Sequence, residues 1–87
     1  MTVYEVFVCN LDKTPLLVIE GRDNLLRAWD LLARAAADGR LASSDSIRLY
    51  EDLLVPGQVA SALLADLGHS TTAVDQENQY LVRLSEI

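Results

Sequence analysis

The chain has 87 residues, of which 51% are hydrophobic, and its 13 acidic and 7 basic residues give a net charge of −6. Its length is typical of one small domain, which we expect to span residues 1–87. The acidity argues against direct binding of nucleic acid or anionic membranes, because both require clustered Lys and Arg. One cysteine excludes an intrachain disulfide, and no apolar run or leader pattern suggests a membrane helix or secretion, so we expect a cytoplasmic protein.

The first predicted element is a β-hairpin. Residues 2–9 and 16–20 are rich in Val, Ile, Leu and aromatic side chains, which favour strands. Residues 10–15 between them contain Asn, Asp and Pro, which favour turns. Both faces of this hairpin are rather apolar, so we expect one face to pack on a helix and the other to be available to a partner.

A helix is predicted over residues 23–38, and Gly39 is a suitable residue to end it. At 100° per residue the apolar side chains fall on one broad face and the charged ones on the opposite face. We expect Trp29 in the core, because a large apolar side chain favours burial. The predicted buried face consists of Leu25, Ala28, Trp29, Leu32, Ala33 and Ala36, and the predicted solvated face of Asp23, Arg27, Asp30, Arg34 and Asp38.

Residues 47–55 fit two structures. As a helix, the apolar residues Ile47, Leu49, Tyr50, Leu53 and Leu54 share one side, which favours this interpretation. As a strand, the segment mixes charged and apolar side chains on each face. The acids at 51 and 52 count against the helix, since they lie near its C-terminal end, where the helix dipole disfavours negative charge. We predict a helix here and keep a strand over 46–52 as the alternative.

The C-terminal part predicts a further helix from Pro56 to Leu67, ended by Gly68, and then strands over 71–76 and 79–85. The predicted fold is therefore α+β. Two β-hairpins form an antiparallel sheet, with two to three helices packed on one face, in the order ββαααββ. The alternative order, with a strand in place of the middle helix, is ββαβαββ.

Motifs of known chemistry are missing from the sequence. The four glycines are isolated, so no phosphate-binding loop is present, and one Cys with one His cannot form a Cys/His zinc site. We therefore expect no cofactor, no metal and no catalytic activity. The alternative is a small-molecule-binding or enzymatic domain that uses Cys9 and His69, since a Cys–His pair can activate a nucleophile. We consider a buried, inert thiol a better interpretation of Cys9.

The uneven charge suggests how the protein acts. Residues 1–40 hold six acids and five bases, net −1, whereas residues 41–87 hold seven acids and two bases, net −5. We expect a small acidic interaction or regulatory domain that binds a protein partner or itself as a homodimer. An alternative is an acidic inhibitor that occupies a basic nucleic-acid-binding site on another protein. The candidate interaction surface consists of Asp45, Glu51, Asp52, Asp66, Asp75 and Glu77.

Overall fold

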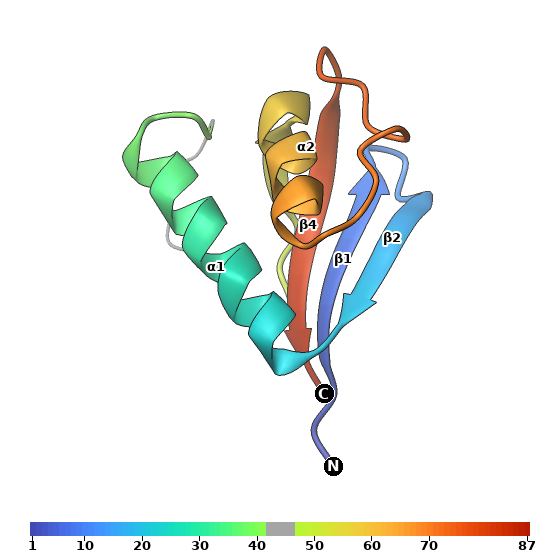
Figure 1. Ribbon diagram of the computed structural model, residues 1–87, viewed down its shortest axis with the longest axis vertical. Coiled ribbons are helices and arrows are strands. Elements are labelled where there is room, and N and C mark those ends of the chain that lie inside the picture. The colour runs from blue at the N-terminus through green and yellow to red at the C-terminus, as the bar shows by residue number, and fades with distance from the viewer. Residues whose placement is uncertain (42–46) are drawn as a thin grey trace.

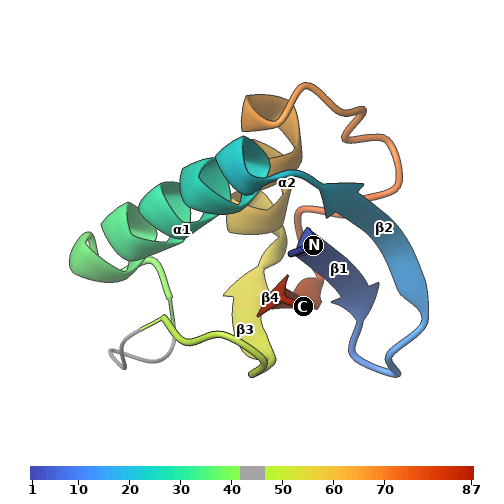
Figure 2. The ribbon, with the colours of Figure 1, turned by 90° about the horizontal axis from the view of Figure 1, so that it is seen from below.

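The computed structural model describes residues 1–41 and 47–87, and these contain six elements in the order ββαβαβ. The strands are β1 (Tyr4–Asn10), β2 (Pro15–Glu20), β3 (Leu53–Pro56) and β4 (Gln79–Glu86); the helices are α1 (Arg22–Ala37) and α2 (Gly57–Asp66). The strands form one antiparallel sheet in the order β2-β1-β4-β3 (Figures 1 and 2). Both helices cover the same face of this sheet (Figure 2). The α+β class and the four-stranded antiparallel sheet are confirmed.

The core lies between the sheet and the two helices. Alternate residues of each strand point to opposite faces, so every second side chain is directed at the helices. On the sheet side, the fully or nearly fully buried residues are Val6, Val8, Ile19, Val55, Tyr80, Val82 and Leu84. On the helix side they are Leu25, Ala28, Leu32, Ala35, Val59, Ala60, Leu63 and Leu64.

Helix α1 is confirmed, although its buried face differs from the predicted one. Ala35 is buried and Ala33 is exposed, whereas Trp29 is half-buried at the edge of the core. The helix therefore presents a narrower stripe to the sheet than the sequence suggested. The predicted end is correct: Gly39 has φ +72°, and Arg40 N–H donates to the Ala35 carbonyl, as in a helix end of the Schellman type.

The helix predicted over 47–55 is wrong. Leu49 forms an isolated bridge with Leu84, Tyr50 has φ +67°, and the strand β3 begins only at Leu53. The alternative strand over 46–52 ends where β3 begins, so it is also displaced. The residue before a proline is restricted to extended backbone, and Val55 precedes Pro56. This restriction, together with pairing to β4, favours a strand over a last helical turn.

The strand predicted over 71–76 is also wrong, and the second hairpin is therefore absent from the described chain. Two turns occupy this region: Val74 N–H donates to the Thr71 carbonyl, and Asn78 N–H to the Asp75 carbonyl. Strand β4 is paired with β1 on one side and with β3 on the other, so neither of its edges is free for residues 71–76. Val74 is nevertheless buried, which explains why the segment resembled a strand.

The two ends of the described chain lie side by side (Figure 1). Val3 N–H donates to the Ile87 carbonyl and Ile87 N–H donates to the Val3 carbonyl, at 2.6 and 2.7 Å. This pair continues the ladder between β1 and β4, the two central strands. The centre of the sheet is thus formed by the first and last strands of the chain.

Candidate functional site

The face of the sheet opposite the helices carries apolar side chains that remain exposed. The described residues place no helix or strand over it (Figure 2). Val18 retains 47% of its possible exposure and Leu54 38%, on the two edge strands, while Phe7 and Leu81 are partly exposed between them. We call this surface the open face, and its strand residues are Glu5, Phe7, Cys9, Val18, Glu20, Leu54, Leu81, Arg83 and Ser85.

The register of the strands arranges these side chains in rows across the sheet. Phe7 is opposite Val18 on one side and Arg83 on the other. The Arg83 guanidinium carbon lies 5.0 Å from the centre of the Phe7 ring, within the range of a cation–π interaction. In the next row Leu81 is opposite both Cys9 and Leu54. The middle of the open face is therefore apolar, with one arginine lying over an aromatic ring.

The charged side chains of the open face form two groups. At one end, Glu5 and Glu20 are directly opposite each other on β1 and β2, and no ion pair joins either carboxylate to a Lys or Arg of the described chain. Beside the Phe7 row, next to Arg83, Asp52 lies between two cations: Lys13 Nζ is 3.7 Å from Asp52 Oδ2, and Arg83 Nη1 is 3.8 Å from Asp52 Oδ1. One end of the open face is thus acidic, and a small ion cluster lies on its β3 side, level with Phe7 and Arg83.

Cys9 belongs to the open face of β1 but is buried, with 2% of its possible exposure. Burial raises the pKa of the Cys9 thiol above its ordinary value, and the carboxylate of Asp52 raises it further, while Arg83 and Lys13 act in the opposite direction. The thiolate is the reactive form of cysteine, so a raised pKa lowers reactivity at neutral pH. These charges, and not His69, act on the thiol. His69 is exposed and follows α2.

We expect iodoacetamide to alkylate Cys9 far more slowly in the folded protein than in urea.

The raised pKa of Cys9 also predicts a pH effect on folding, because the fold favours the protonated thiol. The contribution of Cys9 to the free energy of unfolding should therefore be largest below the ordinary thiol pKa of about 9.0 and should fall as pH rises above it. Urea titrations between pH 7 and 10 on the wild type and on Cys9→Ala isolate this contribution. Rapid alkylation of the native protein by iodoacetamide at pH 7 would contradict the first of these two predictions.

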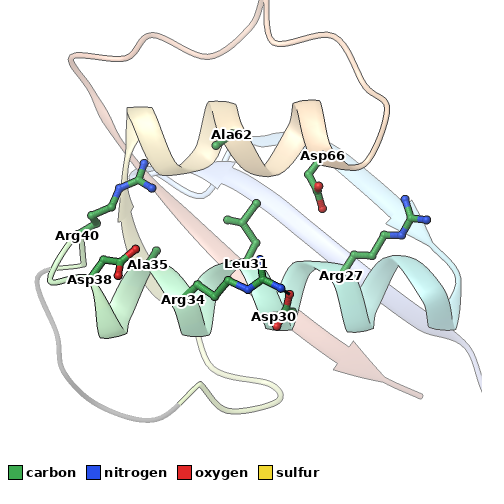
Figure 3. A pocket seen from close by; sticks show the side chains of 9 residues that line it. All are labelled: Arg27, Asp30, Leu31, Arg34, Ala35, Asp38, Arg40, Ala62 and Asp66. Carbon is green, nitrogen blue, oxygen red and sulfur yellow. Dashed lines mark ion pairs between the residues drawn. The ribbon is translucent and has the colours of Figure 1, made fainter.

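A groove lies between the two helices, on the outer side of the molecule. This groove has a volume of about 400 Å³ and a floor formed by Leu31, Ala35 and Ala62. Its charged side chains are three arginines and three aspartates, and Figure 3 shows Arg27 and Arg40 at opposite ends with the Asp30–Arg34 ion pair (2.7 Å) between them. The lining is therefore neutral overall and gives no preference for anions or cations. The residues that line the groove are Arg27, Asp30, Leu31, Arg34, Ala35, Asp38, Arg40, Ala62 and Asp66.

The structure distributes the acidic residues selected from the sequence over several elements. Asp45 lies outside the described residues. Glu51 and Asp52 precede β3, where Glu51 is 3.9 Å from Arg48 and Asp52 belongs to the ion cluster of the open face. Asp66, at the end of α2, lines the groove between the helices. Asp75 and Glu77 lie together in the loop before β4, where the Asp75 carboxylate accepts a hydrogen bond from Glu77 N–H.

The sequence indicated that a face of the first hairpin could bind a partner, but it did not identify the residues that form the open face. Alternation along residues 4–10 places Glu5 and Phe7 on one side, and this much can be read from the sequence. The opposition of Glu5 to Glu20, and of Phe7 to Arg83, depends on the register of two strand pairs. Arg83 and Asp52 come together because β4 lies between β1 and β3, a neighbourhood that the predicted hairpins did not include.

Comparisons of the chain with protein-family models, with curated proteins and with solved structures found no match. Neither described helix is long and apolar enough to cross a membrane. Within residues 1–41 and 47–87, His, Cys, Asp and Glu side chains do not gather in groups of three or more that could hold a metal ion.

Proposed function

We propose that this protein is a small acidic interaction domain of the cytoplasm, without a catalytic step, and that it binds another protein chain through the open face of its sheet. The observation that carries the proposal is a pair of neighbouring rows, Val18 with Phe7 and Leu81 with Leu54, over which the described chain places no helix or strand. The other face of the sheet is covered by both helices. Uncovered apolar surface that lies next to charged side chains is typical of protein interaction sites.

The chemistry of the open face supports binding more than catalysis. The thiol of Cys9 is buried and has a raised pKa, so it is poorly suited to act as a nucleophile. Arg83 lies over the Phe7 ring in the middle of the face, while Val18 and Leu54 remain accessible. This mixture of apolar and charged side chains resembles the composition of many transient interfaces.

Hydroxyl-radical footprinting tests the proposal. Oxidation of Phe7, Val18 and Leu54 is compared in dilute purified protein, in concentrated protein, and in protein added to a lysate of cells that produce it. Leu26, on the outer side of α1, is a matched internal control, because its exposure of 47% equals that of Val18. We expect the three residues of the open face to be protected relative to Leu26 in at least one of the two crowded conditions. Oxidation that matches the control in both would contradict the proposal.

A further inference from the structure

We propose that the chain that binds to the open face is a second copy of the same protein. The inference rests on the proposed function and adds the identity and arrangement of the partner. The two sheets pack face to face, and the two-fold axis lies between them, perpendicular to the strands. In this arrangement β1 of one copy crosses β1 of the other in the opposite direction, and each hairpin lies over its counterpart.

The argument starts from the two carboxylates at one end of the β1–β2 hairpin. Like charges directly opposite each other on neighbouring strands destabilise a sheet, and Glu5 and Glu20 are such a pair without an ion-pair partner in the described chain. Lys13 lies at the other end of the same hairpin, in the turn, and its side chain is 74% exposed. Its ammonium is 3.7 Å from Asp52, which also pairs with Arg83, so Asp52 keeps one cation if Lys13 turns to a partner. A cation placed over the two carboxylates would relieve their repulsion.

The two-fold axis brings these groups together. Because it reverses the direction of the strands, it places the turn of one copy over the Glu5–Glu20 end of the other. Lys13 of each copy then faces the two carboxylates of its partner, and the contact forms twice by symmetry. A two-fold axis parallel to the strands would instead keep the acidic ends of both copies at the same end of the dimer. Charge complementarity therefore favours the perpendicular axis.

The centre of the open face fits this arrangement. Phe7 and Val18 lie between the acidic end and the turn, so they would form the apolar middle of the interface. Four strands spaced about 4.8 Å apart, each contributing about six residues, give a footprint of roughly 400 Å² per copy. The total of roughly 800 Å² is below the roughly 1,000 Å² of a stable specific interface, so we expect only a weak, reversible dimer with a Kd in the range of roughly 10–100 μM.

Sedimentation velocity from about 5 μM to about 1 mM tests the inference on the wild type and on charge-reversed variants. Lys13→Glu places an acid over Glu5 and Glu20 of the partner, and Glu20→Lys places two lysines together. We expect each single reversal to weaken the dimer by roughly tenfold in Kd, since exposed pairs contribute little individually but each occurs twice. The double variant Lys13→Glu with Glu20→Lys, and an equimolar mixture of the two single variants, should both recover the wild-type Kd.

The mixture also controls for the intramolecular contact between Lys13 and Asp52. The Lys13→Glu chain loses this contact both alone and in the mixture, so recovery in the mixture must come from the contact between copies. Leu26→Glu should leave the Kd unchanged, and Val18→Glu should abolish association. If one single reversal does not fold, the other still reports on the contact, since both side chains are exposed.

The outcomes separate this inference from the proposed function. A wild type that stays monomeric throughout overturns the second copy as the partner, while protection of the open face in a lysate would still support the function. A dimer that reversal does not weaken, or that the swap does not restore, overturns the arrangement. A dimer that Val18→Glu leaves intact contradicts the open face as the binding surface and with it the proposed function.

Discussion

Replacement of Gly57 with alanine is expected to destabilise the fold by about 3 kcal/mol or more, the upper end of the effect of overpacking a well-packed interior. Gly57 is the first residue of α2, it is buried, and its N–H donates to the Asn78 carbonyl at 2.7 Å. A Cβ atom at this position would lie 2.2 Å from the Asp75 carbonyl oxygen and 2.8 Å from the Gln76 Cα. Both are backbone atoms, which cannot move aside as a flexible side chain would.

The physical reason is a close approach between two parts of the backbone. The start of α2 lies against the loop that leads into β4, so any side chain at 57 must displace that loop or the helix. Displacement of the loop would also disturb the pairing of Pro56 with Gln79, where β3 meets β4. The sheet and the helix layer would therefore both be affected by one added methyl group.

Urea unfolding followed by circular dichroism measures the effect, and Gly39→Ala is the matched control. Gly39 has φ +72° and nothing within 4 Å of an added Cβ, so alanine there meets backbone strain without a collision. Such strain costs about 1–2 kcal/mol for an L-residue. We expect Gly57→Ala to be the more destabilising of the two. Equal or reversed effects would show that the loop adapts and that the close approach is unimportant.

Leu32→Ala is expected to lower the free energy of unfolding by about 3 kcal/mol, within the usual range for removing a buried leucine. Leu32 lies in the middle of α1 and is fully buried in the core between the helices and the sheet. The change removes apolar contacts and leaves a cavity that the surrounding helices and strands can only partly fill. For a chain of this length, total stability is about 4–13 kcal/mol, so the loss is a large fraction of it.

Thermal unfolding provides the measurement, and a drop in Tm of about 15 °C is expected for this size of protein. Leu26→Ala is the control on the same helix, because Leu26 is 47% exposed and its truncation should change stability by no more than about 0.5 kcal/mol. Similar effects at 26 and 32 would mean that α1 does not bury the stripe described above.

The sequence was most informative where a single periodicity extends over many residues. Helix α1 has 16 residues with a consistent apolar stripe, so its existence and its end at Gly39 could be predicted. Strand β3 has four residues, and two of them, Leu53 and Leu54, happen to satisfy a helical pattern together with the preceding Leu49 and Tyr50. A segment this short takes its structure from its pairing with β4 more than from its own composition.

The open face illustrates a different limit. The alternation of Glu5, Phe7 and Cys9 along β1 is a local property, which the sequence contains. The pairing of Glu5 with Glu20 and the stacking of Arg83 on Phe7 require the order of the strands, and this order depends on contacts between residues up to about eighty positions apart. The predicted second hairpin placed β4 beside residues 71–76, so it could not suggest that Arg83 lies next to Phe7.

The position of the chain ends has a mechanical consequence. Val3 and Ile87 lie at the same end of two neighbouring antiparallel strands, joined by reciprocal hydrogen bonds. A tensile force applied through these two residues would therefore act across the ladder between β1 and β4 and would open it one hydrogen-bonded pair at a time, in the manner of a zipper. Because β1 and β4 are the central strands, this rupture would divide the sheet into halves, β2-β1 and β4-β3. The domain should yield to stretching at much lower forces than one whose end strands are sheared lengthwise.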